Sequence, residues 1–201
     1  MRRAMREHER SVQQCNSCAL HEERTTAVVG SGPIDARLVV VAAVPRRHED
    51  LHGEPLSGGP RNVLDAAMTD VGLDPAQVRV TTVVRCRPQD DRAPELDEIR
   101  ACGSHLRNEL NVVAPEVIVT LGAMPTSVVM GRSVPLDRVA GYRLDVLNGI
   151  TLVPTFPPGD AMRGAPQAVG ALKRDLSVAK AVLDGRMSTG AEAMAQLRAR
   201  V

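Results

Sequence analysis

The stretch Arg37-Leu-Val-Val-Val-Ala-Ala-Val44 is a nearly continuous apolar run. A run this short and this apolar is typical of a strand that is buried on both faces of a parallel sheet. Similar runs recur at residues 78–84, 117–121 and 150–155, and helical patterns separate them. The alternation predicts an α/β fold, a three-layer sandwich around a central, mostly parallel four-stranded sheet.

Helical patterns lie before, between and after these apolar runs. We expect helices at residues 3–14, 61–71 and 166–183, a helix that Pro94 opens and that continues to about Leu110, and a short helix that ends near Met130. Residues 142–147 could add an edge strand. The pattern predicts one domain over residues 1–184, followed by a short helical tail over residues 185–201.

The composition is that of an ordinary soluble protein, with 201 residues and a net charge of +1. No apolar run approaches membrane-spanning length and the charged N-terminus is not a signal peptide, so we expect a cytoplasmic protein without membrane contacts. Lysine occurs only at positions 173 and 180, which leaves arginine as 23 of the 25 basic residues. Arginine suits phosphate groups, although a codon preference for arginine would give the same skew.

The chain contains four cysteines, and their spacing is informative. Cys15 and Cys18 form a C-x2-C pair, and fifteen residues separate Cys86 from Cys102. In a reducing compartment such cysteines are better explained as metal ligands than as disulfides, and thiolates select iron–sulfur clusters or zinc. The alternative is four buried cysteines acting as small hydrophobic residues. We predict that all four hold one metal centre, an iron–sulfur cluster in the first place and zinc as the alternative.

Several longer motifs follow one another in a fixed order. They are C-N-S-C-A-L-H-E-E-R-T at 15–25, G-S-G-P-I-D-A-R-L-V-V-V at 30–41, E-D-L-H-G-E-P-L-S-G at 49–58, V-V-R-C-R-P at 83–88, P-E-V-I-V-T-L-G at 115–122 and V-P-T-F-P-P at 153–158. In these motifs the chain resembles the family 4 uracil-DNA glycosylases, the iron–sulfur branch of that superfamily. The resemblance implies a structural 4Fe-4S cluster on the four cysteines, DNA as the partner, and a monomeric enzyme of base excision repair.

Four positions of the uracil pocket depart from the family pattern. The family's acidic residue after the first strand falls at Ala43, and its stacking Phe falls at Leu56. Its base-reading Asn falls at Thr82, and the His of its His-Pro motif falls at Pro157. A site that lacks its hydrogen-bonding groups can reject a ligand by a factor on the order of 10⁴. The sequence therefore predicts little or no excision of uracil.

Most of these replacements are smaller than the family residue, so the pocket is expected to be larger. A larger pocket suits a bulky modified base, such as a hypermodified bacteriophage cytosine, and the protein would then serve antiviral defence. We expect substrate contacts from residues at the matched pocket positions, which are Ala43, Pro45, Leu56, Thr82 and Phe156. Arg46 and His48 would add donors at the mouth of the pocket, where the family has glycine and variable residues. The competing hypotheses are a catalytically inactive DNA-binding homologue, a degenerate homologue with another ligand, and a residual uracil-DNA glycosylase.

Two carboxylates remain as candidates for the chemistry. Asp50 matches an acidic residue of the family and is the first candidate for activating water or balancing charge on the sugar, with capping of loop amides as the alternative. Asp160 is the second candidate, with a helix N-cap as the alternative. For the DNA backbone we expect contacts from Arg61, Arg85, Arg87 and Arg163, each of which could equally be a solvated surface residue.

Overall fold

The structure is a computed structural model that describes residues 1–146, 149–163 and 167–187. Its helices are α1 (Arg2–Gln13), α2 (Arg47–His52), α3 (Gly58–Asp70), α4 (Leu96–Val113), α5 (Ala123–Met130), α6 (Pro158–Met162) and α7 (Gln167–Leu183). Its strands are β1 (Leu38–Ala42), β2 (Val78–Thr82), β3 (Val117–Leu121), β4 (Leu144–Asp145) and β5 (Thr151–Thr155). Short 3₁₀ turns occur at Ala19–His21, Pro75–Gln77, Gln89–Asp91 and Leu136–Arg138.

The strands form one sheet in the order β2-β1-β3-β5-β4. The first four strands in this order run parallel, whereas β4 pairs antiparallel with β5 through Leu144 and Leu152. The predicted α/β class and the mostly parallel sheet are confirmed, and the sheet has five strands where four were expected. The additional strand is the suggested edge strand, and only two of its residues pair.

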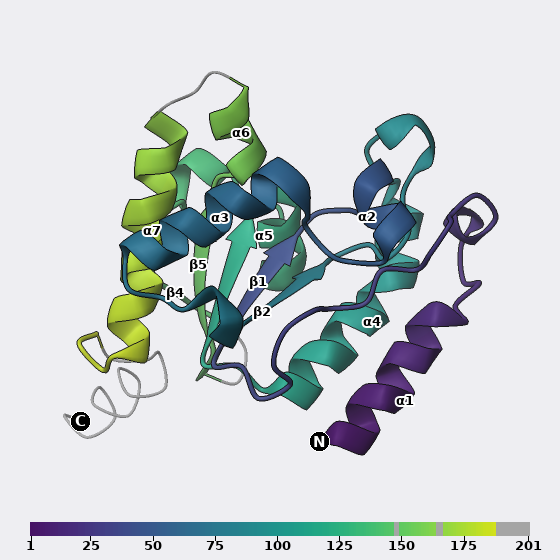
Figure 1. Cartoon of the computed structure of the whole chain (residues 1–201), viewed down its shortest axis with the longest axis horizontal. Helices are drawn as coiled ribbons and strands as arrows, with labels where there is room; N and C mark the ends of the chain where they lie inside the picture. The colour runs from purple at the N-terminus through teal and green to yellow at the C-terminus, as the bar shows by residue number, and fades with distance from the viewer. Residues whose placement is uncertain (147–148, 164–166, 188–201) are drawn as a thin grey trace.

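One face of the sheet is covered by α3 and α7. Val40, Val80 and Val119 point to this face because side chains alternate along a strand. They pack against Leu64 of α3 and Leu176 of α7 in a core cluster that consists of apolar residues only. We call this side the aliphatic face, and Figure 1 shows its two helices crossing the sheet.

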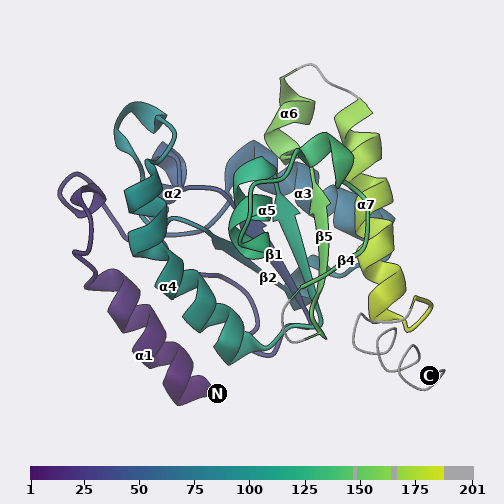
Figure 2. The ribbon, with the colours of Figure 1, turned by 180° about the vertical axis from the view of Figure 1, so that it is seen from behind.

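The opposite face is covered by α4 and α5. Val41 and Ile118 point to it and pack with Leu106 of α4 in a second core cluster. Cys86 and Cys102 belong to the same cluster, so we call this side the cysteine face. Figure 2 shows α4 along this face, with α1 beside α4 on its far side from the sheet.

The N-terminal helix α1 is attached through one narrow stripe. Met5, His8 and Val12 recur at the spacing of a single helix face, and all three are buried. The rest of α1 is mainly charged and mostly exposed. The helix therefore docks on α4 with a surface that includes a titratable side chain.

The predicted elements are largely confirmed, and their ends differ by a few residues. The helix α2 was not predicted, because six mainly charged residues show no apolar periodicity. From residue 188 onward the predicted tail lies outside the described residues, and so does position 166 of the last predicted helix. In the described ranges no helix is both long enough and apolar enough to span a membrane.

Candidate functional site

The four cysteines come from three separate segments and line one small cavity on the cysteine face. Cys15 and Cys18 follow the end of α1, Cys86 follows β2, and Cys102 lies in α4. Cys86 and Cys102 are buried, and the other two are partly exposed. The arrangement brings together all the thiols of the chain, as the spacing led us to expect, although metal binding itself stays a prediction.

Hydrogen-bond donors surround the buried sulfurs. The Arg24 guanidinium donates to Cys86 Sγ at 3.1 Å, and the backbone N–H of Arg85 donates to Cys102 Sγ at 3.3 Å. Burial raises the pKa of the Cys102 thiol to about 11, and it also raises the pKa of Cys86. Donors of this kind stabilise thiolates and tune a metal centre. Burial therefore favours the neutral thiols, and the two donors would stabilise the sulfurs once a metal had displaced their protons.

The spacing of the thiols bears on which metal would fit. Four thiolates around one zinc ion must lie only about 3.8 Å apart, because each Zn–S bond is about 2.3 Å. Within the described ranges, no three His, Cys, Asp or Glu side chains are grouped closely enough to hold one metal ion. The four cysteines thus share one cavity without forming a single-ion site, and the choice between a cluster and zinc stays a prediction.

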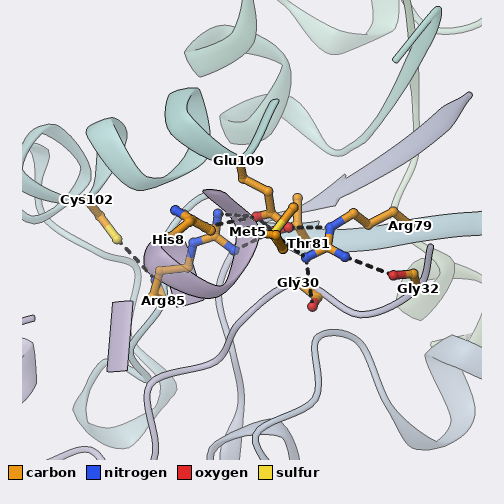
Figure 3. Close-up of polar contacts among 9 residues, drawn as sticks. All are labelled: Met5, His8, Gly30, Gly32, Arg79, Thr81, Arg85, Cys102 and Glu109. Atoms are coloured by element: carbon orange, nitrogen blue, oxygen red, sulfur yellow. Dashed lines mark hydrogen bonds and ion pairs between the residues drawn. The ribbon is translucent and has the colours of Figure 1, made fainter. Parts of the chain in front are cut away.

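A buried ionic network lies next to the cysteine cavity (Figure 3). Glu109 of α4 is fully buried, and its two carboxylate oxygens accept hydrogen bonds from Arg79 at 2.6 Å and Arg85 at 2.7 Å. The Thr81 hydroxyl donates to Glu109 at 2.6 Å and accepts a hydrogen bond from Arg85. Two guanidinium groups and one carboxylate leave this network with one excess positive charge.

The remaining donors of Arg79 reach the segment that precedes β1. They bind the carbonyl oxygens of Gly30 at 3.0 Å and Gly32 at 2.9 Å. A Cβ at Gly30 would lie 1.8 Å from Glu109 Oε1, so this position accepts only glycine. Because a buried guanidinium is stable only when its donors are paired, these carbonyls are part of the network.

Two buried histidines complete the interior of the cysteine face. Burial lowers the pKa of His8 to about 4, the nearby Glu109 raises it, and the charges of Arg85 and Arg79 lower it. Burial likewise lowers the pKa of His105. The two rings meet edge to face, with centroids 6.1 Å apart. Both imidazoles are therefore neutral at pH 7 and add no charge to the network.

The predicted substrate contacts lie at the carboxyl edge of the sheet, where parallel α/β proteins bind ligands. Ala42 and Thr82 are paired in the β1–β2 register, which sets Ala43 and Pro45 beside the end of β2. The Thr82 hydroxyl is buried and has no hydrogen-bond partner among the described residues. A buried hydroxyl without a partner is uncommon in folded proteins, which marks this position at the end of β2 as unusual.

Backbone strain marks the same edge. Leu56 has a φ of +53°, a left-handed conformation that disfavours a bulky residue. Gly122, after β3, has a φ of +104°, and a Cβ there would lie 3.2 Å from the Pro157 ring after β5. Strained residues concentrate at binding sites. Phe156, beside this proline, is partly exposed.

The first catalytic candidate, Asp50, is held by backbone amides. Its side chain is buried, and its carboxylate accepts hydrogen bonds from the amides of Thr25 at 3.0 Å and Thr26 at 3.3 Å. These contacts connect α2 to the segment that follows the C-x2-C pair. They match the alternative that we considered for this residue, and its catalytic role stays a prediction.

The neighbouring Glu49 is also committed to backbone contacts. Burial raises its pKa, but hydrogen bonds donated by Ser57 and by the Arg46 amide outweigh this effect and leave the pKa below its usual value. Its carboxylate accepts from the Ser57 hydroxyl at 2.6 Å and from the Arg46 N–H at 3.0 Å. The ionised Glu49 therefore fixes the segment between β1 and α3.

The second catalytic candidate, Asp160, is partly exposed in α6. Its carboxylate pairs with the guanidinium of Arg163, which is largely exposed. The residue lies inside the helix and not at its N-cap position, which Pro157 occupies. Asp160 is thus the more accessible of the two predicted carboxylates.

The predicted DNA-contacting arginines fall into two groups. Arg61 pairs with Asp65 at 2.7 Å, Arg87 pairs with Asp91 at 2.7 Å, and both are partly exposed. Arg85 is only 1% exposed. The structure corrects the expectation that Arg85 contacts DNA, since its guanidinium is enclosed in the Glu109 network. Arg46 and His48 are exposed, as a role at the mouth of a pocket requires.

Sequence reasoning missed most of the ionic network. Cys102, His105 and Glu109 lie at i, i+3 and i+7 in α4, so they share one helix face that could have been identified from the sequence. An arginine at position 79, within an otherwise apolar strand, was a second signal. Its pairing with Glu109 could not be predicted, because it joins residues that are thirty positions apart.

Comparison with known proteins identifies the family. The model of the uracil DNA glycosylase superfamily matches residues 29–181. The type-4 uracil-DNA glycosylase of Thermotoga maritima is 37% identical over 153 residues, which cover 76% of this chain and 80% of that protein. That of Saccharolobus solfataricus is 31% identical over 163 residues, covering 77% and 76%. That of Archaeoglobus fulgidus is 38% identical over 113 residues, covering 56% and 57%.

The chain therefore belongs to the uracil DNA glycosylase superfamily, whose members are DNA N-glycosylases. The family match over residues 29–181 includes all five described strands and most of α7.

Proposed function

We propose that this protein is a DNA glycosylase that removes a base other than uracil. The observation that carries the proposal is the carboxyl edge of the sheet, where Ala43, Leu56, Thr82 and Pro157 replace the acidic, aromatic, amide and imidazole groups of the family. The unpaired Thr82 hydroxyl offers one hydrogen bond to a base. A bulky modified cytosine of bacteriophage DNA fits an enlarged pocket, and its removal would serve antiviral defence.

The reaction would follow the general logic of base excision. The target nucleotide is flipped out of the duplex, and water then replaces the base at the sugar. As the base departs, positive charge develops on the sugar, and a carboxylate beside it lowers the barrier. We assign this role to Asp160 in preference to Asp50, because Asp160 is partly exposed while the Asp50 carboxylate is engaged by two backbone amides.

We further propose that the four cysteines hold a resident 4Fe-4S cluster. The shared cavity and the donors directed at Cys86 and Cys102 support a metal centre, and the resemblance to the iron–sulfur branch of the family favours a cluster over zinc. The cluster would supply a cross-link among three segments, two of which are also joined through the Glu109 network. Its place on the cysteine face separates it from the carboxyl-edge residues that would bind the base.

DNA would approach the carboxyl edge, on which Arg46 and Arg163 are exposed. Arg61 and Arg87 could also bind phosphates, but each would first have to leave its carboxylate partner. Each such phosphate contact makes binding weaker as salt rises. We propose a cytoplasmic monomer as the acting form.

The test is an excision screen with the cluster-loaded protein. Duplexes carrying uracil, hypoxanthine, xanthine, hydroxymethylcytosine or its glucosylated form are incubated with the protein and then cleaved with alkali. We expect strand breaks only with a bulky modified cytosine, and their loss in Asp160→Asn. Asp97→Asn is the matched control, because Asp97 also pairs with an arginine three residues later in a helix. Efficient removal of uracil would overturn the proposed specificity.

A second candidate is a DNA-binding homologue without catalysis. It is favoured by the fact that Asp50 and Glu49, the acidic pair matched to the family, both have their oxygens engaged by the chain itself. Binding to all duplexes with no cleavage of any would support this candidate and eliminate the glycosylase.

A further inference from the structure

The helix α2 carries a sequence that neither the cluster nor the base pocket uses. Residues 48–52 read His-Glu-Asp-Leu-His, which is the H-E-x-x-H pattern. On a helix this spacing sets two imidazoles on one face, where they can bind a metal ion together. His48 and His52 are both exposed, so a cation can reach them from solvent.

The two imidazoles are already neighbours. Their rings are stacked with centroids 4.2 Å apart and planes inclined by 23°. Two nitrogens on one tetrahedral zinc lie about 3.3 Å apart, because each Zn–N bond is about 2.0–2.1 Å. To bind one ion, the two rings must turn out of their stacked arrangement until both Nε2 atoms point at it.

The hydrogen bonds of His52 fix its tautomer. Its Nδ1 lies 2.8 Å from the backbone carbonyl oxygen of His48. A carbonyl oxygen can only accept a hydrogen bond, so Nδ1 must carry the proton. In the neutral ring, Nε2 then holds a lone pair and is free to bind a metal ion.

The same conclusion holds for His48 through a chain of two hydrogen bonds. Its Nδ1 lies 2.7 Å from the Ser57 hydroxyl, which in turn donates to Glu49 Oε1 at 2.6 Å. Both Glu49 oxygens accept backbone N–H groups, and Ser57 gives its single hydroxyl proton to Glu49, so His48 Nδ1 must be the donor to the Ser57 oxygen. The Nε2 lone pair of His48 is therefore also available.

The role of Glu49 excludes the chemistry usually associated with this pattern. In zinc proteases the glutamate faces the metal and acts as a general base. Here Glu49 is 8% exposed, and both of its oxygens accept hydrogen bonds from Arg46 and Ser57. It acts on the metal site only by fixing the tautomer of His48. In the described ranges no third ligand joins the pair, so water must complete the coordination.

We infer that His48 and His52 form a surface site for one borderline divalent cation, with zinc as the probe. Imidazole nitrogens suit zinc, copper and nickel, whereas magnesium and calcium require oxygen ligands. The site lies on the segment between β1 and α3, which also carries Arg46 and Leu56, so a bound cation adds positive charge close to the carboxyl edge. This inference does not depend on glycosylase activity.

The test is calorimetric titration of the cluster-loaded protein with zinc chloride at pH 7.5. We expect one zinc ion to bind, with affinity reduced at least about tenfold in His48→Ala and in His52→Ala, because each variant loses a ligand. Ser57→Ala should weaken binding by roughly ten- to a hundredfold, the range for loss of a group that orients a metal-binding histidine. Leu51→Ala, on the same helix and 55% exposed, is the matched control and should leave the affinity unchanged.

The visible absorbance of the cluster is followed in the same samples, so that zinc bound in place of iron is detected. Equal zinc affinity in the wild type and both histidine variants would overturn the site, as would no binding by the wild type. Full affinity in Ser57→Ala would overturn the tautomer argument.

Discussion

Different interactions pack the helices against the two faces of the sheet. On the aliphatic face, Val80 and Leu176 belong to one apolar core cluster, and the buried Asp175 of α7 pairs with its neighbour Arg174. On the cysteine face, the same strand β2 directs Arg79 and Thr81 toward Glu109 of α4. The alternation of β2 thus separates an apolar interior from an ionic one across the thickness of one sheet.

Because of this difference, substitutions in the two interiors should change the free energy of unfolding in different ways. In an apolar core, a large-to-small substitution lowers the free energy of unfolding in proportion to the volume of the cavity that it leaves. Surrounding side chains can relax and reduce this loss. A buried ionic network contributes little as a whole, but removal of one member leaves the others charged and unpaired. The network also borders the cysteine cavity, because the Arg85 N–H donates to Cys102 Sγ. Disrupting the network should therefore also weaken metal binding by the cysteines.

The largest effect is expected for Glu109→Gln. This change leaves Arg79 and Arg85 buried without a counter-charge, and breaking a buried pair costs about 3–5 kcal/mol. Urea unfolding measures the free energy, and iron content should fall with it. Glu116→Gln is the control, since Glu116 pairs with Arg37 at the surface and should cost under about 1 kcal/mol. Equal costs at the two positions would contradict the distinction.

A truncation on the aliphatic face should cost less and leave the metal centre intact. Leu176→Ala creates a cavity at a fully buried site and should lower the free energy of unfolding by about 2–4 kcal/mol. Iron content per folded chain should match that of the wild type. Loss of iron in this variant, at a temperature where it is folded, would show that the two faces are not independent.

The cysteine face should also weaken in acid. The pKa of His8 is about 4 when folded and about 6.5 when unfolded, so the unfolded chain binds more protons between these values. Stability should therefore be complete above pH 6.5 and fall as the pH drops toward 4, by up to about 3 kcal/mol. His105 contributes in the same direction.

The free energy of unfolding, measured from pH 7.5 to pH 4.5, checks this dependence. His8→Leu should flatten the curve in that range. An unchanged slope in this variant would mean that His8 does not titrate as its burial requires.

The smallest effect is expected at the carboxyl edge and has the opposite sign. Thr82 continues the aliphatic side of β2, but its buried hydroxyl has no partner among the described residues. Thr82→Val should stabilise the protein by about 0.5–1 kcal/mol, because an unsatisfied polar group is replaced by one of the same shape. Thermal unfolding measures the change. A loss of stability would show that the hydroxyl is satisfied in the native protein.

The sequence was sufficient for those features that depend on local pattern. The apolar runs predicted the four parallel strands, because each of these strands is buried on both faces. The count and spacing of the cysteines predicted that they would meet, and they line one cavity.

Other features depend on tertiary contacts and could not be predicted. The capping of Thr25 and Thr26 amides by Asp50 joins residues with no sequence relation. The burial of Arg85 depends on Glu109, which lies in another element, so a surface role was assigned to it incorrectly. The helix α2 was overlooked because its stability comes from the Glu49 contacts and not from an apolar stripe.

The most direct test of the account is the metal content of the protein purified without oxygen. If Cys15, Cys18, Cys86 and Cys102 hold one cluster, the wild type should contain about four iron atoms and four acid-labile sulfides per chain. Cys102→Ser should lose both together. One zinc ion in place of iron, lost in Cys102→Ser, would contradict the cluster. A wild type that is fully folded without metal would contradict the assignment of the cysteine face as a metal centre.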